Sequence, residues 1–470
     1  MFVGRSKELA ELQRAYSSDA FEMVVVYGRR RVGKTTLLTH FAQGKPTLFF
    51  AAQQQSARNN LVDFSSAIAD FFSLPSGMEF SSWQAAFEFL AEQAEADPFL
   101  LVFDEFPYAA ASDRSLVSSL QATIDHKLSK TKLCLVLCGS DQGFMEGEVL
   151  GKKSPLHGRR TAQIRVRPFD YLDAAKMLQG ASDEDAFRYY ACVGGVPYYL
   201  ARVDTSLSFE QNMARLFFDP NGFLYEEPLM LLRQELREPA LYNSILRAIG
   251  SRANKQNEIA DRAGIEQGVV NKYLQTLIRL DIVERVVPFG ESPERSRRGL
   301  YRLLDGCYDF WYAFVMPAVN DIEEGAGRVV ASSLPGDALA TYLGRRFERV
   351  CLEWMRRQSL AGMLPIAASA FGSWWGANPF MHEQDDIDVV AADRFQKKAI
   401  IGECKWRNSF DESEAIGKLM GRDGCIKGYD VCAHWLFSKN ALSKGTAEKM
   451  RACDGMRSIT LADLYLERDS

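Results

Sequence analysis

A glycine-rich segment near the start of the chain has the residue types that hold a phosphate chain. Gly28, Gly33, Lys34 and Thr35 fit the spacing GxxxxGK[ST] in full. Glycines at these positions let backbone N–H groups face phosphates at the start of a helix. Lys34 would reach the β and γ phosphates, and the Thr35 hydroxyl would bind Mg²⁺. The predicted ATP-binding residues of this segment are Gly28, Arg29, Arg30, Arg31, Val32, Gly33, Lys34, Thr35 and Thr36.

Two consecutive acids later in the chain complete this chemistry. Asp104 and Glu105 follow Phe99–Phe103, an apolar run with the composition of a strand buried on both faces. Asp104 would hold Mg²⁺, directly or through water, and Glu105 would polarise the water that attacks the γ-phosphate. Alone, the two acids could be a solvated strand end. Together with the glycine-rich segment they predict ATP hydrolysis.

A second set of acids, with a lysine, lies in the C-terminal part of the chain. Asp388 belongs to an acidic cluster, and Glu403 and Lys405 are two residues apart, so their side chains share one face of a strand. Asp388 and Glu403 would hold Mg²⁺, which prefers carboxylate oxygens. Lys405 would orient or activate a water that attacks phosphorus. Asp386 is an alternative to Asp388, and Glu348 is a candidate fourth member.

Strand-like and helix-like segments alternate around the first set of residues. The run Met23–Tyr27 precedes the glycine-rich segment, and the helix-like sequence TTLLTHFA follows it. This alternation predicts an α/β domain over residues 1–168, with a parallel sheet and helices on both faces. The other strand-like runs are Thr47–Ala51, Leu133–Leu137 and Gln163–Val166. Ser140 follows one of these runs, where a polar side chain could sense the γ-phosphate.

The middle of the chain is predicted to be mostly helical. Residues 169–235 carry several aromatic pairs and would form a helical lid. Residues 236–305 have three helix-like segments and then two strand-like runs, IVERVVPFG and GLYRLLD, an order that predicts a winged helix. The three helix-like segments are Pro239–Gly250, Asn257–Ala263 and Gln267–Asp281.

Basic side chains of the predicted winged helix could contact DNA phosphates. They lie on the polar side of its last helix and in its hairpin. The candidates are Asn271, Lys272, Gln275, Arg279, Arg295, Arg297 and Arg298. Acids dilute this patch, and winged helices also bind proteins, so both uses stay open.

A new domain is predicted to begin after a connector at residues 306–334. Within residues 335–470, a helix-like segment from Leu343 to Arg357 precedes the strand-like run Ala367–Trp375. The acid–lysine set follows on the next two strand-like runs.

Composition bounds the class of protein. With 47% hydrophobic and 25% charged residues, the chain is neither disordered nor a collagen nor a coiled-coil rod. A net charge of -5 excludes a globally basic protein but not a local basic patch. The nine cysteines form no CxxC pair, which argues against a zinc site. No apolar run approaches the ~18 residues of a membrane span, and we expect a cytoplasmic protein without a membrane partner.

The chain resembles the prokaryotic AAA+/STAND-like ATPases, and among them the archaeal-type ATPases with a C-terminal nuclease-like domain. The resemblance covers nearly the whole chain and is carried, in this order, by FVGR, GRRRVGKT, LLVFDE, LCGS, LHGRRT and GGVPYYL. It implies that Gly4 and Arg5 lie near the base and ribose, and that Pro197 packs near the adenine. It also implies that Ser140 is the sensor-1 residue.

The same resemblance implies that Arg159 is an arginine finger, with Arg160 as a second candidate. Such a residue acts on the nucleotide of its own chain or of a neighbour, so a homo-oligomer is one expectation.

The acid–lysine set resembles the PD-(D/E)xK restriction-endonuclease-like superfamily, which has an αβββαβ core. Ile387 stands where the superfamily's proline precedes the aspartate. An active nuclease and an inactive remnant both fit this pattern.

Three functions compete on these grounds. The leading hypothesis is an ATP-hydrolysing, DNA-associated protein whose Mg²⁺-dependent endonuclease-like domain is gated by nucleotide state. The alternative is a STAND-like regulatory switch whose C-terminal domain docks a partner without cleaving it. A third is a transcription regulator that uses the winged helix alone.

Overall fold

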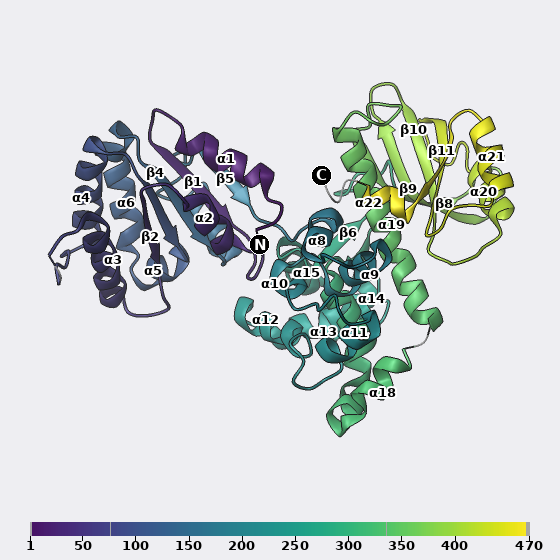
Figure 1. Cartoon of the computed structure of the whole chain (residues 1–470), viewed down its shortest axis with the longest axis horizontal. Coiled ribbons are helices and arrows are strands. Elements are labelled where there is room, and N and C mark those ends of the chain that lie inside the picture. The colour runs from purple at the N-terminus through teal and green to yellow at the C-terminus, as the bar shows by residue number, and fades with distance from the viewer. Residues whose placement is uncertain (1, 76, 335, 467–470) are drawn as a thin grey trace. The chain divides into compact units, whose positions relative to one another are not determined.

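The computed structural model describes residues 2–75, 77–334 and 336–466, and the chain divides into two compact units (Figure 1). Unit 1 comprises Met1–Pro168 together with Val196–Tyr198. Unit 2 comprises Phe169–Gly195 together with Tyr199–Ser470. The short segment Val196–Tyr198 therefore belongs to unit 1 although unit 2 flanks it on both sides.

Unit 1 is built on a five-stranded parallel sheet of strand order β2-β3-β4-β1-β5. This confirms the predicted α/β class with a parallel sheet. Strands β1, β3 and β4 are buried along their whole length, since apolar residues occupy both of their faces. The strands are β1 (Glu22–Tyr27), β2 (Thr47–Ala51), β3 (Leu100–Asp104), β4 (Cys134–Gly139) and β5 (Ala162–Arg165).

Helices cover both faces of this sheet (Figure 1). On one face the rings of Phe64, Trp83, Phe87 and Phe103 pack together, with centroids 5.4 to 6.2 Å apart between Trp83 and its neighbours. On the other face α1 and α2 pack against β1 and β4. The helices are α1 (Ser6–Tyr16), α2 (Lys34–Ala42), α3 (Ala57–Phe72), α4 (Trp83–Ala96), α5 (Phe106–Ser112), α6 (Ser115–His126) and α7 (Gln142–Phe144).

Unit 2 begins with a helical part that ends in a hairpin. Helix α15 ends two residues before the predicted Asp281, because Asp281 has a left-handed φ of 54°. Strands β6 (Val283–Val286) and β7 (Leu300–Leu303) then pair antiparallel. The preceding helices are α8 (Tyr171–Met177), α9 (Asp183–Val193), α10 (Pro197–Leu200, begun in unit 1), α11 (Phe209–Phe217), α12 (Glu227–Glu235), α13 (Pro239–Gly250), α14 (Gln256–Ala263) and α15 (Gln267–Arg279).

The second sheet of unit 2 has five strands in the order β12-β11-β10-β9-β8. Strands β8, β9 and β10 pair antiparallel, and β10, β11 and β12 pair parallel. The strands are β8 (Ala370–Ala377), β9 (Gln384–Asp393), β10 (Lys398–Lys405), β11 (Asp430–Ser438) and β12 (Met456–Thr460). The helices are α16 (Gly306–Phe310), α17 (Val319–Asp321), α18 (Gly327–Ser332), α19 (Gly336–Leu360), α20 (Glu412–Met420), α21 (Lys444–Ala452) and α22 (Leu461–Tyr465).

Two predicted boundaries in this part were wrong. Helix α19 has 25 residues and starts at Gly336, well before the predicted Leu343. Its first turns carry polar residues outside the apolar repeat, so the sequence pattern missed them. Strand β8 starts and ends later than the predicted Ala367–Trp375, since the ladder with β9 joins Ala370 to Ala392 and Ala377 to Gln384.

The hairpin loop between β6 and β7 packs against the second sheet of unit 2. The Phe289 amide donates to the carbonyl of Ser373 at 2.8 Å, and the Phe289 ring lies 5.6 Å from that of Tyr429. Arg298 donates to the carbonyl of Trp375 and pairs with Glu291 at 2.9 Å. Arg298 therefore serves packing within unit 2, which argues against its predicted place among the phosphate contacts.

Phe289→Ala should lower the free energy of unfolding of unit 2 by about 1–3 kcal/mol, because it removes a half-buried ring from this contact. Urea denaturation followed by tryptophan fluorescence would measure the loss. Phe395→Ala is the matched control, since Phe395 is 93% exposed and should change stability by less than ~0.5 kcal/mol. Equal effects of the two substitutions would contradict the packing role of Phe289.

Candidate functional site

The glycine-rich loop connects β1 to α2 and encloses the Lys34 side chain. Gly33 caps α2 with a left-handed φ of 88°, and a Cβ on Gly28 would lie 2.2 Å from the carbonyl oxygen of Val166. Lys34 Nζ donates to the carbonyls of Gly28 at 2.9 Å and Arg29 at 3.0 Å. The loop thus has the glycines that its geometry requires, and its lysine is 6% exposed.

The predicted Mg²⁺ and water-activating residues meet at the ends of β3 and β4. Thr35 Oγ1 donates to Asp104 Oδ2 at 2.7 Å, which joins the start of α2 to the end of β3. Glu105 Oε2 accepts from the Ser140 amide at 3.2 Å and from the Ser140 hydroxyl at 2.9 Å. The structure therefore brings Thr35, Asp104, Glu105 and Ser140 together beside the loop.

Two further predicted nucleotide contacts touch the loop from outside it. Arg5 is 7% exposed and donates to the carbonyl of Val32 at 2.8 Å. A Cβ on Gly33 would lie 3.9 Å from Cγ of Pro197. The Arg31 guanidinium lies 5.2 Å from the ring centroid of Tyr198. The segment Val196–Tyr198 thus packs on the loop, which accounts for its place in unit 1.

The donor groups of this site fit a magnesium nucleotide. The N-terminus of α2 supplies backbone N–H groups and Lys34 supplies an ammonium group, both of which suit phosphate. The Thr35 hydroxyl and the Asp104 carboxylate supply hard oxygens, which suit Mg²⁺.

The predicted arginine finger is held within unit 1. Arg159 makes a two-pronged ion pair with Asp125, with both N–O distances 2.6 Å, and this bond lowers the pKa of Asp125. Arg159 also donates to the carbonyls of Pro155 and His157. Arg160 donates to the side chain of Gln163. The part played by either arginine toward a nucleotide stays a prediction.

The acid–lysine set of unit 2 lies on β9, β10 and α19. Glu403 Oε1 is 2.5 Å from Lys405 Nζ, and Glu403 Oε2 accepts from Arg422. Burial acts to raise the pKa of Glu403, but Arg422 and Lys405 outweigh it and lower that pKa. Glu403 is therefore held as a charged carboxylate between two cations.

The two other carboxylates lie close to Glu403 and are held differently. Asp388 Oδ2 accepts from the Cys404 amide at 2.8 Å, and burial, followed by the charges of Glu348 and Glu403, raises the pKa of Asp388. Burial raises the pKa of Glu348 to about 7. Asp386 has a side chain 65% exposed and is a poorer candidate than Asp388.

Asp388 and Glu403 suit the usual binding of Mg²⁺ through one or two carboxylates. In the described part of the chain, however, no group of three or more His, Cys, Asp or Glu side chains is arranged to hold a metal ion. Glu403 would also have to exchange Lys405 or Arg422 for the ion.

Sequence reasoning missed Arg422, which is 1% exposed and also contacts Asp385 at 3.0 Å. It lies beyond α20, outside every motif, and only the folded chain brings it to β10.

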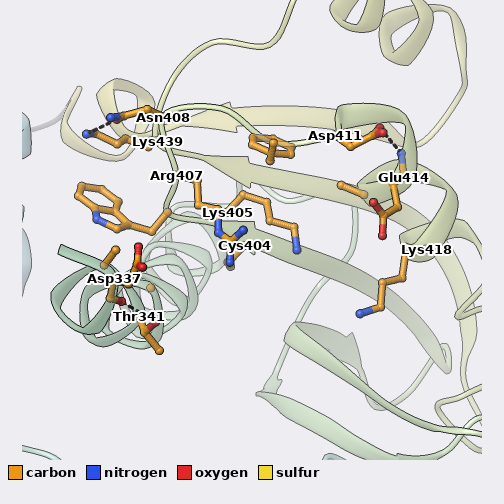
Figure 2. A pocket seen from close by; sticks show the side chains of 15 residues that line it. Asp337, Thr341, Cys404, Lys405, Arg407, Asn408, Asp411, Glu414, Lys418 and Lys439 are labelled. Atoms are coloured by element: carbon orange, nitrogen blue, oxygen red, sulfur yellow. Dashed lines mark hydrogen bonds between the residues drawn. The ribbon is translucent and has the colours of Figure 1, made fainter. Parts of the chain in front are cut away.

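A cavity of about 910 Å³ opens beside Lys405 (Figure 2). Figure 2 shows Lys405 between the start of α19, where Asp337 is labelled, and α20, which carries Lys418. Lys439 lies 5.3 Å from the ring of Trp406 and pairs with Glu184 at 2.7 Å. Trp406 itself is packed against Phe187, so it belongs to the core of unit 2.

The polar side of α15 is exposed as predicted, and its apolar side is buried. The exposed side chains include Asn271, Lys272, Gln275 and Arg279. The buried ones are Val270, Tyr273, Leu274 and Leu277. Arg295 and Arg297 of the hairpin loop are also exposed.

Comparisons with known proteins agree with the site in unit 1. Residues 2–203 match a family described as an ATPase domain predominantly from Archaea. Residues 311–416 match a family of archaeal and bacterial proteins of unknown function. Residues 2–203 thus resemble archaeal P-loop ATPase domains, which agrees with the ATP binding and hydrolysis predicted from the glycine-rich loop and the two acids. Residues 311–416 resemble the second family.

Individual relatives extend these matches. An uncharacterized protein of Methanocaldococcus jannaschii is 29% identical over 447 residues, which cover 93% of this chain and 97% of that protein. An uncharacterized ATP-binding protein of the same organism is 44% identical over 45 residues, 10% of this chain and 76% of that protein.

A solved structure supports the fold. The Walker-type ATPase of Pyrococcus abyssi is 18% identical to this chain and superposes with a TM-score of 0.50. The superposition covers 66% of this chain and 96% of that one.

None of the described helices is both long and apolar enough to cross a membrane.

Gly28→Ala should weaken ATP binding by more than about tenfold, because the new methyl group would push the loop away from Val166. Titration with a fluorescent ATP analogue would measure this. Gly147→Ala is the control, since a Cβ there has no neighbour within 4 Å. Unchanged affinity of a folded Gly28→Ala protein would contradict the close approach to Val166.

Glu348→Gln should stabilise the protein at pH 8 and do so less at pH 5. The pKa of Glu348 is about 7 in the folded chain, above its ordinary value of 4.5. Between these values the unfolded chain loses the proton first, so stability falls as pH rises, and glutamine removes this loss. Thermal unfolding across pH would test it, with the exposed Glu414→Gln as control. A pH-independent difference would contradict it.

Proposed function

We propose that this ATPase acts on DNA, and that its C-terminal domain cleaves phosphodiester bonds with Mg²⁺ in a manner governed by the nucleotide state. The observation that carries the proposal is the convergence of Glu348, Asp388, Glu403 and Lys405 from α19, β9 and β10. The chain order of these elements, a helix followed by three strands, a helix and a strand, supports the restriction-endonuclease-like core.

ATP hydrolysis follows from the residues around the loop. Lys34 and the N-terminus of α2 would bind the phosphates, while Thr35 and Asp104 would hold Mg²⁺, which neutralises charge on the transferred group. Glu105 would take the proton of the attacking water, and the Ser140 hydroxyl fixes the Glu105 carboxylate for this task.

The base and ribose would lie near the residues that touch the loop from outside. Gly4 and Arg5 precede α1, and Pro197 lies against Gly33. Arg159 would serve a neighbouring chain's nucleotide only after leaving Asp125, which makes an oligomer with such a contact a proposal in its own right.

In unit 2, Asp388 and Glu403 would hold Mg²⁺, which supplies charge stabilisation at the scissile phosphate. Lys405 lies 2.5 Å from Glu403 and would orient the attacking water. Asp388 is fixed for this role by the hydrogen bond from the Cys404 amide.

The element order supports the proposed domains. These are an ATPase core at 1–168, a helical lid at 169–235, a winged helix at 236–305, a connector at 306–334 and a nuclease-like domain at 335–470. The turn at Gly264 between α14 and α15, followed by the β6–β7 hairpin, supports the winged helix.

A regulatory switch with a non-cleaving C-terminal domain is the second candidate. One observation favours it: Glu403 is already held by two cations, Lys405 and Arg422. A domain of this kind would use its charged residues for structure or docking, and nucleotide turnover would be slow.

Plasmid DNA incubated with the protein and Mg²⁺, with and without ATP, distinguishes the two. We expect nicking or cleavage, lowered at least about 100-fold by Asp388→Asn and by Lys405→Ala. Asp430→Asn, at an exposed position of β11, is the control. Absence of cleavage, or cleavage that survives both substitutions, would contradict the nuclease and favour the switch.

Glu105→Gln should lower kcat for ATP hydrolysis by about 10²–10⁴-fold with ATP affinity nearly unchanged, since it removes a base and leaves the phosphate contacts. Phosphate release and analogue binding would be measured on the same preparation. Glu146→Gln, outside the strand ends that carry the site, is the matched control.

A further inference from the structure

A second cavity of unit 2, of about 470 Å³, has walls rich in arginine. The end of α13 and the turn after it, the hairpin strands β6 and β7, helices α16 and α19 and strands β8 and β9 form these walls. The acid–lysine set thus borders two cavities. Lys405 lines the cavity of Figure 2, whereas Glu348 and Asp388 line this second cavity.

Some of the arginines in the second cavity are neutralised by neighbouring acids. Arg349 pairs with Glu284 at 2.8 Å and with Glu353 at 3.4 Å. Arg346 lies 4.0 Å from Asp309 and donates to the carbonyl of Leu304 at 3.1 Å. Glu284 and Glu353 are thus engaged by Arg349, whereas Asp309 acts on Arg252 and Arg345 as well as on Arg346.

Other arginines of the same walls lack such partners. The side chains of Arg252, Arg302 and Arg345 make no hydrogen bond and no ion pair within residues 2–75, 77–334 and 336–466. Within the same residues, the Arg356 guanidinium makes no hydrogen bond and no ion pair, and it lies 5.8 Å from the ring centroid of Phe371. Burial, followed by the positive charge of Arg252, lowers the pKa of Arg345. Asp309 and Glu348 offset part of this positive charge, and the excess of arginine in these walls favours an anionic ligand.

The guanidinium groups match phosphate in shape and charge, because a planar fork of donors binds two phosphate oxygens at once. Their spread is larger than one phosphate. Arg345 and Arg356 are eleven residues apart on α19, about 16 Å along the helix. A nucleic-acid strand, with a charge about every 3.4 Å of duplex axis, supplies several phosphates over that length.

We propose that this cavity binds successive phosphates of a DNA strand and sets the strand against Glu348 and Asp388. The inference rests on the proposed function and names the groups that hold its substrate. It assigns DNA contact in residues 236–305 to Arg252 and Arg302, which face the cavity, in addition to the exposed side of α15.

Fluorescence anisotropy of a labelled DNA duplex, titrated with full-length protein over a range of salt, tests this. The combined variant Arg252→Gln, Arg302→Gln and Arg345→Gln should reduce the slope of log K against log salt by about 2 to 3, because each lost phosphate contact removes about 0.9. A matched variant neutralises three exposed arginines outside the cavity, Arg58, Arg394 and Arg451, and should keep the slope.

Asp388→Asn separates this inference from the proposed nuclease. Cleavage lost in that variant with DNA affinity retained supports both. A reduced slope in the triple arginine variant without cleavage in any protein supports the cavity and contradicts the nuclease. An unreduced slope with normal cleavage by the wild type contradicts the cavity alone.

Chemical modification keeps the test valid should the triple variant fail to fold. Bound duplex should protect Arg252 and Arg302 of the wild-type protein from phenylglyoxal, as read by mass spectrometry of their peptides, and should leave Arg394 reactive. Protection by tripolyphosphate without protection by the duplex would show a small-anion site and overturn the proposal, as would no protection by either.

Discussion

Parallel pairing of β4 with both β1 and β3 is the constraint on which the ATPase site depends. The ladders join Tyr27 to Gly139 and Phe103 to Leu137, so the carboxyl ends of these strands reach the same edge of the sheet. The glycine-rich loop follows one end, Asp104 and Glu105 another, and Ser140 the third. At this edge the Thr35–Asp104 hydrogen bond joins the start of α2, which follows the glycine-rich loop, to the end of β3.

In the second sheet, the charges of neighbouring side chains determine how the candidate site residues are held. Arg422 and Lys405 keep Glu403 ionised, while Asp388 and Glu348, which are half-buried close to it, have raised pKa values and resist ionisation. Three negative carboxylates at this distance would repel one another strongly. Lys405 and Arg422, which pair with Glu403, reduce the free-energy cost of holding the three acids together. A positive charge that approaches Asp388 and Glu348 from the second cavity would therefore stabilise their ionised forms.

The sequence was sufficient for residues whose chemistry and local structure coincide. Lys34 and Thr35 could be predicted because a phosphate-binding loop consists of residues close together in the sequence. Asp104 could be predicted because it follows an unbroken apolar run that is typical of a buried strand. Glu403 and Lys405 were predictable for the same reason, as neighbours on one strand face. Arg422 was not, because its contacts with Asp385 and Glu403 join residues far apart in the chain. The arginines of the second cavity that make no ion pair could not be predicted either, since three separate segments, the turn after α13, β7 and α19, bring them together.

The chain passes from unit 1 to unit 2 after Pro168, returns for Val196–Tyr198 and leaves again at Tyr199. Unit 1 therefore does not end after its last strand, β5, but also includes Val196–Tyr198. Pro197 and Tyr198, which lie against the loop, are tethered by peptide bonds to α9 on one side and continue directly into α10 on the other. The residues that lie against the phosphate loop are thus joined to helices assigned to unit 2 by peptide bonds on both sides.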